Sequence, residues 1–312
     1  RNLRKDNNGN GNNKEAFSLM QFNILAKSLC DSKAFPNSKE EDLEWESRCA
    51  LFKRVFSDEL DLYCLEEVDD LNNIIGFFPS EIYGCIYYKK KTGAAGGQAL
   101  FYKKQRFSKS YSEELALPID EEGNLGSQLS LVSVLTDKLS GLGYMIVVNH
   151  LKAKQNEENE EIRLVQVHFL NKYLSSDKVR ALVKEYQVDG IIVAGDFNAT
   201  PSNKAVSSFV SEKHSLQLEE QTILSRFSSC FDIDEESINY LGFTSAKSRD
   251  KFHSYLIDYV FISDRLEVVE SKRALPDLRL TDIPNGLPTK DFPSDHLYLQ
   301  VKLRIKNKEI KK

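Results

Sequence analysis

Six short stretches of this chain place carboxylate, amide or imidazole side chains inside an apolar run or where one ends. They carry Asn23, Glu66 and Glu67, Asn149 and His150, Asp196 and Asn198, Asp258, and Asp295 and His296. Taken singly, most of these residues suit an ordinary turn or a solvated strand end. Asp258 differs because it lies inside the apolar run Leu256–Phe261, where a carboxylate is costly unless it is paired. Together they favour one site assembled from several strand ends.

The chemistry of this set is that of a metal-assisted phosphoesterase. It contains carboxylates, amides and imidazoles but no thiol, and such donors suit Mg²⁺, with Mn²⁺ as a substitute, rather than zinc. A bound divalent ion neutralises the phosphoryl oxygens while a carboxylate orients the attacking water. A buried Asp beside a His keeps the imidazolium charged toward an oxyanion. The residue types therefore predict hydrolysis of a phosphate ester.

Apolar runs and helical stripes indicate the elements that must position these residues. Strands are predicted at 17–25, 62–68, 83–88, 98–107, 129–136, 143–150, 190–197, 256–263 and 297–305. Helices are predicted at 41–56, 160–174 and 203–212, the last opened by a Thr200 cap and Pro201. Since no linker divides the chain, we expect one α/β domain at 17–306, with two packed sheets and helices outside. Residues 1–16 are expected to be a disordered leader and 307–312 a basic tail.

Composition limits the classes of partner and compartment. The 312 residues include 42 Lys and Arg against 47 Asp and Glu, so the net charge of -5 argues against a protein that coats long polyanions. The five cysteines are scattered without a paired motif, which indicates reduced thiols in an intracellular protein. We expect the cytoplasm, with the mitochondrion as the alternative because the chain begins at Arg1 and not at Met. No apolar run approaches the length of a membrane span.

The motifs together resemble the endonuclease/exonuclease/phosphatase superfamily. They are MQFNILAKSL (20–29), HLKAK (150–154), GDFNATP (195–201), IDY (257–259) and FPSDHL (292–297). Within the superfamily they are similar to the deadenylase branch that contains nocturnin and the carbon catabolite repressor deadenylases. The resemblance covers about residues 17–305 and implies a four-layer α/β sandwich, with two mixed sheets flanked by helices.

The resemblance also implies a role for each matching residue. Metal-side ligands would be Glu67 as the principal one, Asn23 and Asp295. The catalytic set would be Asp196 for orienting water, Asn198 and His150 for contacting the phosphoryl group, and His296 with its partner Asp258 for stabilising the oxyanion. Substrate would be bound by Asn149, Lys152, Lys154 and Arg163. Glu66 stands where many relatives carry Gln, and we expect it to face solvent, with a place behind the metal ligands as the alternative.

The implied activity is Mg²⁺-dependent 3′–5′ shortening of poly(A) RNA with release of AMP. The alternatives are a nocturnin-like NADP(H) 2′-phosphatase, a 2′,5′-oligoadenylate phosphodiesterase and, from another class, a catalytically silent scaffold. The expected partners are single-stranded poly(A) RNA or an adenine nucleotide and, among proteins, components of mRNA decay.

A basic stretch offers a second point of contact with nucleic acid. Residues 85–112 contain no acid but seven Lys and Arg interleaved with aromatic residues. Charge for the backbone and rings for stacked bases suit single-stranded nucleic acid. A hairpin with a solvated lysine face and a core aromatic face predicts the same pattern equally well.

Overall fold

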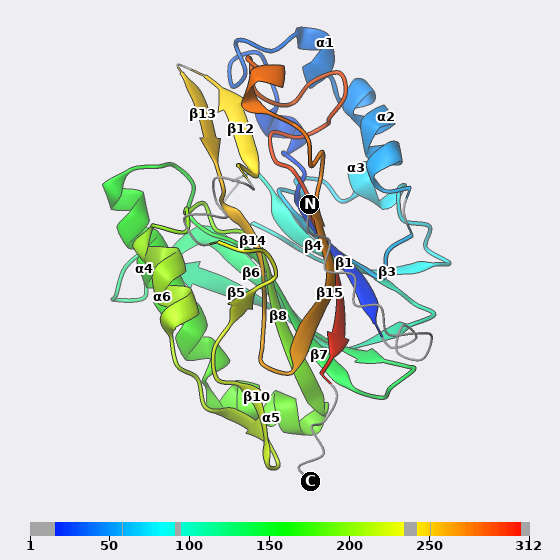
Figure 1. Ribbon diagram of the computed structural model, residues 1–312, viewed down its shortest axis with the longest axis vertical. Coiled ribbons are helices and arrows are strands. Elements are labelled where there is room, and N and C mark those ends of the chain that lie inside the picture. Colours follow the sequence, from blue (N-terminus) through cyan, green and yellow to red (C-terminus); the bar gives the residue numbers. More distant parts are fainter. Residues whose placement is uncertain (1–15, 58, 91–94, 234–241, 250, 307–312) are drawn as a thin grey trace.

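The computed structural model describes residues 16–57, 59–90, 95–233, 242–249 and 251–306, and in it two six-stranded mixed sheets pack face to face (Figure 1). The first sheet has the order β15-β16-β1-β2-β4-β3 and the second β11-β14-β8-β7-β6-β5. The first sheet comprises β1 (Phe17–Asn23), β2 (Leu62–Glu66), β3 (Tyr83–Lys89), β4 (Gly97–Lys103), β15 (Leu266–Arg273) and β16 (Leu299–Ile305). The second comprises β5 (Phe107–Pro118), β6 (Leu125–Asp137), β7 (Gly143–His150), β8 (Val188–Asp196), β11 (Ser228–Ser229) and β14 (Asp258–Ile262).

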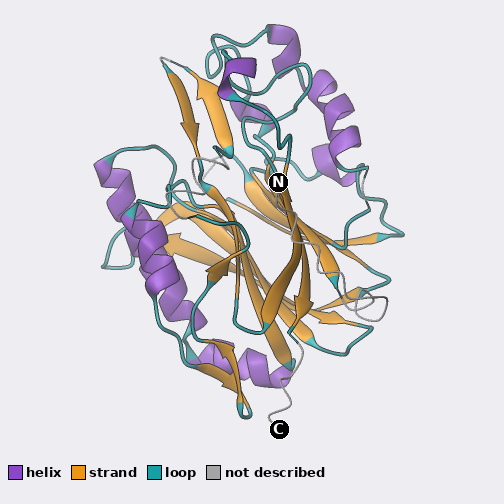
Figure 2. Ribbon diagram, viewed as in Figure 1, coloured by secondary structure: helices purple, strands orange, loops and turns teal. Residues whose placement is uncertain are grey.

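Helices cover the outer face of each sheet, so the predicted four-layer α/β sandwich is confirmed (Figure 2). The first sheet is covered by α1 (Glu40–Leu43), α2 (Trp45–Val55) and α3 (Asn72–Ile75). The second is covered by α4 (Glu157–Leu174), α5 (Asp177–Glu185) and α6 (Lys204–Ser211). Two small hairpins complete the described part, β9 (Leu216–Leu218) with β10 (Gln221–Leu224) and β12 (Ser245–Ser248) with β13 (Phe252–Tyr255). No helix in this part is long and apolar enough to cross a membrane.

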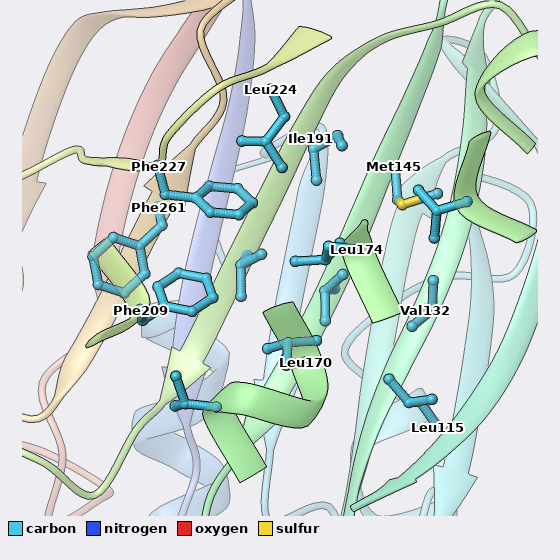
Figure 3. Packing of buried hydrophobic residues seen from close by; sticks show 14 of the residues in the cluster. Leu115, Val132, Met145, Leu170, Leu174, Ile191, Phe209, Leu224, Phe227 and Phe261 are labelled. Atoms are coloured by element: carbon cyan, nitrogen blue, oxygen red, sulfur yellow. The ribbon is translucent and has the colours of Figure 1, made fainter. Parts of the chain in front are cut away.

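Three apolar layers hold the sandwich together. In one, α4 and α6 bury Leu170, Leu174 and Phe209 against second-sheet residues such as Met145 and Phe261 (Figure 3). A matching layer lies between α2 and the first sheet. The third fills the space between the two sheets with alternate residues of nearly every central strand. Both faces of the central strands are therefore buried, which explains why those strands read as continuous apolar runs.

Side-chain alternation extends the inner layer into a polar edge. On β1, Phe17 and Leu19 point between the sheets, so Gln21 and Asn23 share that face. On β2, Cys64 points between the sheets, so Glu66 does as well. In the second sheet, β7 and β8 end at His150 and Asp196 and β14 begins at Asp258, and these side chains also point between the sheets. Since His150 and Asp258 both pair with Asp196 across the ladder, these side chains meet at one edge of the sandwich.

The structure departs from the sequence prediction mainly at edge strands. The prediction missed β5 and β15 because one face of each meets solvent and carries Ser, Glu and Lys instead of apolar residues. The last helix begins at Lys204 with Asn203 at its cap position, so the predicted Thr200 cap is wrong. The Asn203 side chain instead accepts from Thr200 N. Residues 1–15 of the predicted leader and the tail 307–312 lie outside the described residues, while Ala16 is buried.

Gly195, which precedes Asp196, permits the closest approach of β8 to β7. A Cβ at this residue would lie 1.8 Å from the Asn149 carbonyl oxygen, and the backbone φ is +152°. We expect Gly195→Ala to lower the free energy of unfolding by about 3 kcal/mol, the upper end for overpacking. Urea denaturation checks this against Gly76→Ala, where no atom lies within 4 Å of the added Cβ. Equal stability of the two variants would contradict the expected clash.

Candidate functional site

The centre of the polar edge is formed by Asn23, Glu67 and Asp196. The Asn23 amide nitrogen donates to Glu67 Oε1 at 3.1 Å and to Asp196 Oδ2 at 3.0 Å. Its amide oxygen accepts from Leu25 N, which fixes the orientation of the amide. The strand ends of the two sheets are thus joined through one side chain. In this orientation Asn23 positions the two carboxylates instead of directing its oxygen at them.

Glu67 reaches this centre because the chain turns sharply after β2. Its φ is +59°, in the left-handed region, so the side chain does not continue the alternation of the strand. Its second carboxylate oxygen accepts from Ala26 N at 3.1 Å. Backbone and side-chain contacts therefore hold Glu67 beside Asn23, where the sequence predicts a metal ligand.

His296 and Asp258 form a buried pair next to Asp196. His296 Nδ1 lies 2.9 Å from Asp258 Oδ2, and His296 Nε2 lies 3.7 Å from Asp196 Oδ2. Burial alone would lower the pKa of His296, but the three carboxylates of Asp258, Asp295 and Asp196 offset it and raise that pKa to about 10. His296 is therefore a protonated imidazolium at neutral pH, as the sequence predicts for an oxyanion-stabilising group.

His150, in contrast to His296, is uncharged. Its Nε2 lies 3.6 Å from Asp196 Oδ2 and 4.0 Å from Glu67 Oε1. Burial, with a further contribution from the positive charge of Lys90, holds the pKa of His150 well below its usual range. One neutral and one charged imidazole thus lie near the same oxygen of Asp196, and they can accept and donate different protons.

Asn198 and Asp295 complete the set at the rim. Asn198 follows the strand in a left-handed conformation with φ of +49°, and its N–H donates to Asp196 Oδ1 at 2.7 Å. Its side-chain nitrogen donates to Leu151 O at 3.2 Å. Asp295 Oδ2 receives the ammonium of Lys247 at 3.1 Å. Burial alone would raise the pKa of Asp295, but the charges of Lys247 and His296 more than offset it and lower that pKa.

Three lysines supply positive charge around the carboxylates. Lys90 at the end of β3 is buried, and burial lowers its pKa against the opposing charges of Glu67 and Asp196. Lys152 is half-buried and close enough to Lys90 for their charges to interact. Lys247 reaches the site from the β12–β13 hairpin. A substrate at this edge would meet acids at its centre and cations around it, as phosphate esters require.

The donors present fit a divalent cation. Ligand atoms of Asp196, Asp258 and His296 lie within 4.8 Å of one another, although His296 and Asp258 also bind each other. Glu67 adds a further carboxylate through Asn23. Burial, with a smaller contribution from the charge of Asp258 and opposed by His296, raises the pKa of Asp196 to about 7. A cation beside this carboxylate would stabilise its ionised form, and oxygen donors favour Mg²⁺ or a similar hard ion.

Three of the predicted substrate-binding residues lie apart from the centre. Asn149 is on the other face of β7, where its side chain accepts from Ser130 Oγ. Arg163 is 1% exposed, and its guanidinium binds Glu160 and the carbonyl oxygens of Lys152 and Lys154. The Arg163 geometry supports a role in holding the 152–154 loop. Lys154 is exposed at the start of that loop's turn toward α4.

The expectation about the flanking residue Glu66 is wrong. Glu66 does not face solvent: it is fully buried, and its Oε2 accepts from Gln21 Nε2, which also donates to Asp258. Burial, together with the charge of Asp258, raises the pKa of Glu66 well above its usual range. Gln21 was missed, although it lies two residues before Asn23 on the same strand face.

In its described part, the basic stretch 85–112 packs its aromatic rings on the apolar layers. Its rings belong to the apolar layers, either as buried members or packed against them; they are Tyr87, Tyr88, Phe101, Tyr102 and Phe107. Arg106 binds Asp61 and Asp137 at the far end of the hairpin. Lys91 lies outside the described residues. The charge of Lys90 acts on Glu67 and Asp196, and the packing of the rings favours the hairpin with a core aromatic face.

Comparison with known proteins places the chain in a family. The sequence model of the endonuclease/exonuclease/phosphatase family matches residues 20–296. Human nocturnin is 30% identical over 295 residues, which cover 90% of this chain and 63% of nocturnin. A probable CCR4-Not complex 3′-5′-exoribonuclease subunit Ccr4 from Vairimorpha ceranae is 23% identical, with 93% of this chain and 64% of that protein covered. The chain thus spans less than two thirds of either protein.

Solved structures agree on the fold. The human nocturnin catalytic domain with bound sulfate superposes with a TM-score of 0.69 at 22% identity, covering 93% of this chain and 95% of that one. ANGEL2, a 2′,3′-cyclic phosphatase in complex with adenosine-2′,3′-vanadate, superposes with a TM-score of 0.73 at 22% identity, covering 94% and 96%. The family match over residues 20–296 agrees with the four-layer sandwich and the site at its strand ends. This chain therefore belongs to the endonuclease/exonuclease/phosphatase family.

Proposed function

We propose that this protein is a Mg²⁺-dependent 3′–5′ exoribonuclease that shortens poly(A) RNA and releases AMP. The observation that carries the proposal is the single edge where Glu67, Asp196 and the His296–Asp258 pair meet. Lysines surround these groups, as a polyanionic substrate requires. The chain is similar to a Ccr4 protein that is named as a probable 3′-5′-exoribonuclease. This similarity supports RNA as the substrate.

The geometry supports a division of roles in hydrolysis. Asp196 would accept a hydrogen bond from the attacking water and hold it in line with the scissile bond. His296, kept charged by Asp258, would donate from Nε2 to the phosphoryl oxygen as negative charge develops there. Mg²⁺, when held by Glu67 and its neighbours, supplies further positive charge to the phosphoryl oxygens. His150 would stay neutral and donate or accept a single hydrogen bond.

A pair of rings beside the site supports a nucleobase in the substrate. His253 and Tyr255 stack with ring centroids 5.9 Å apart and an interplanar angle of 17°. On the β12–β13 hairpin they pair with Lys247 and Ser245, so they share the face whose lysine reaches Asp295. Both rings are half-buried, which leaves surface for a base to stack on. Stacking tolerates any base, so the preference for adenine rests on the resemblance of the motifs to the deadenylase branch.

A second candidate is a phosphatase acting on the 2′-phosphate of NADP(H). It is favoured by the separate positions of Lys90 and Lys247, on different sheets and hairpins around one centre. Two cationic points can bind phosphates other than the one being cleaved. Both candidates use the same centre and differ in the groups that surround it.

One purified sample tests these proposals. With Mg²⁺, we expect the protein to shorten a 3′-terminal oligo(A) tract one nucleotide at a time and to release AMP. The 5′-labelled products are resolved on a gel and AMP is identified by chromatography. Glu67→Gln should abolish the reaction because it removes a carboxylate from the centre while keeping its shape. EDTA should do the same.

Parallel substrates decide among the alternatives. If oligo(A) survives while NADP⁺ yields NAD⁺ and phosphate, the exoribonuclease proposal fails and the phosphatase stands. Cleavage of 2′,5′-oligoadenylate alone, or of an RNA with a 2′,3′-cyclic phosphate end alone, would equally overturn it. If no substrate reacts with Mg²⁺ or Mn²⁺, the result overturns both enzyme proposals and favours the silent scaffold.

A further inference from the structure

Arg48 of α2 is a fully buried arginine that contacts two segments of the site. Its Nη2 donates to the carbonyl oxygens of Ile24 at 2.7 Å and Leu25 at 2.6 Å. Its Nε donates to the carbonyl oxygen of Pro293 at 2.6 Å. The rigid guanidinium therefore spans two segments that are far apart in sequence, and its planar fork fixes the distance between them.

One of these segments carries Asn23, which holds the carboxylates of Glu67 and Asp196, and the other carries Asp295 and His296. Ile24 and Leu25 directly follow Asn23, and Pro293 comes two residues before Asp295. Leu25 has φ of +56°, a strained conformation for a residue with a side chain. Arg48 holds its carbonyl group while the Asn23 side chain holds its N–H at 3.1 Å. The strained turn is thus fixed from both sides, and it determines where the Asn23 amide points.

A neighbouring bond ties the same segments. Ser294 Oγ donates to the Asn23 carbonyl oxygen at 2.7 Å and accepts from His296 N at 3.1 Å. Arg48 and Ser294 therefore both tie the segment that begins at Asn23 to the segment before Asp295.

Stability alone does not account for an arginine at this position. Arg48 is 0% exposed, and in the described part of the chain the carboxylates of Asp295 and Glu67 act on it only from beyond ion-pair distance. Its guanidinium packs over Trp45 and Phe52, at 5.3 Å and 5.6 Å from the ring centroids. A buried charge without a carboxylate partner is costly, and an apolar side chain of similar length would avoid that cost.

We propose that Arg48 is a positioning residue that sets the separation of the Asn23 and Asp295–His296 segments and so the affinity of the site for its divalent ion. This inference rests on the proposed function, since it concerns the metal used there. It needs the fork of the guanidinium as well as its charge, because only the fork reaches carbonyl groups on both segments.

The test compares Arg48→Lys and Arg48→Met with wild type. Mg²⁺ affinity is measured by isothermal titration calorimetry, and thermal unfolding is followed with and without Mg²⁺. We expect both variants to bind Mg²⁺ about 10- to 100-fold more weakly, as is typical when residues supporting metal ligands are changed. The stabilisation that Mg²⁺ gives the wild type should shrink accordingly.

Arg106→Met is the control for loss of a largely buried arginine, although Arg106, unlike Arg48, also binds Asp61 and Asp137. Arg106 also packs over two rings, Phe17 and Phe107, and donates to a carbonyl group, that of Ala16. It lies at the opposite end of β1 from Asn23. We expect it to lose stability with Mg²⁺ affinity within about twofold of wild type, because distant sites are nearly independent.

The outcomes separate the inference from the proposed function. Arg48 variants that bind Mg²⁺ as wild type does overturn the inference, and so does a wild-type affinity in Arg48→Lys alone, which would mean that charge suffices. If Arg48→Met does not fold, Ser294→Ala tests the same junction and should also weaken Mg²⁺ binding. A wild type that binds Mg²⁺ but hydrolyses no RNA refutes the proposed function and leaves the inference intact. A wild type that binds no divalent ion overturns both.

Discussion

Replacing Asp196 by Asn should lower the rate of phosphoester hydrolysis by about 10³-fold, a typical loss for a group that holds the attacking water. The same change should alter the free energy of unfolding by less than about 1 kcal/mol, because two effects oppose each other. Asn removes a carboxylate whose burial raises its pKa to about 7, but it also removes the attraction of that carboxylate for His296. Activity on oligo(A) and urea denaturation measure the two quantities.

Asp189→Asn is the matched control for this prediction. Asp189 lies near the start of β8, whose last residue is Asp196, and it is also buried. Its carboxylate binds Arg265 at 2.9 Å and 3.0 Å, far from the site. We expect a loss of about 1–3 kcal/mol in stability from a charge-assisted pair, with wild-type activity. If Asp196→Asn kept activity, or if both variants lost it equally, Asp196 would have no direct part in the reaction.

Much of the fold could be predicted because the central strands are buried on both faces. The apolar runs that become β1, β7, β8 and β16 were placed within two residues of their observed ends. Edge strands such as β5 and β15 carry alternating polar residues, and such a pattern does not distinguish a strand from an exposed loop. Helix α5 was missed although its apolar residues Val179, Leu182 and Val183 are buried at helical spacing.

The site could be predicted in composition but not in its supporting contacts. The strand-end residues Asn23, Asp196 and Asp258 stood out because polar side chains interrupt apolar runs. Glu66 was misjudged because two adjacent acids suggest a solvated turn. Which of the two acids is buried between the sheets depends on one dihedral angle, the left-handed φ of Glu67. Because the chain turns at Glu67, Glu66 keeps the alternation of β2 and points inward. Arg48 resembles any basic residue on an amphipathic helix until the two segments that it joins are placed in space.

Replacing Asp258 by Ala should both unfold the protein more easily and stop the reaction. The carboxylate of Asp258 binds His296 Nδ1 at 2.9 Å and Gln21 Nε2 at 3.0 Å, so its loss leaves a buried imidazolium and a buried amide without that acceptor. Breaking one partner of a buried pair costs about 3–5 kcal/mol. Loss of the carboxylate that orients a catalytic imidazole lowers the rate by about 10⁴-fold in the Ser-His-Asp hydrolases, and we expect a similar loss here.

The double variant Asp258→Ala/His296→Ala shows whether the two residues act as one unit. Once His296 is absent, no imidazolium is left unpaired, so removing Asp258 as well should cost less than it does alone. We expect the two stability losses to fall short of additivity by about 1–3 kcal/mol, the range for residues in direct contact. The two losses of activity should likewise not multiply, because each change already removes the charged His296. Additive effects in both measurements would mean that Asp258 and His296 are neighbours without being partners, and the role proposed for His296 at the phosphoryl group would then need another source for its positive charge.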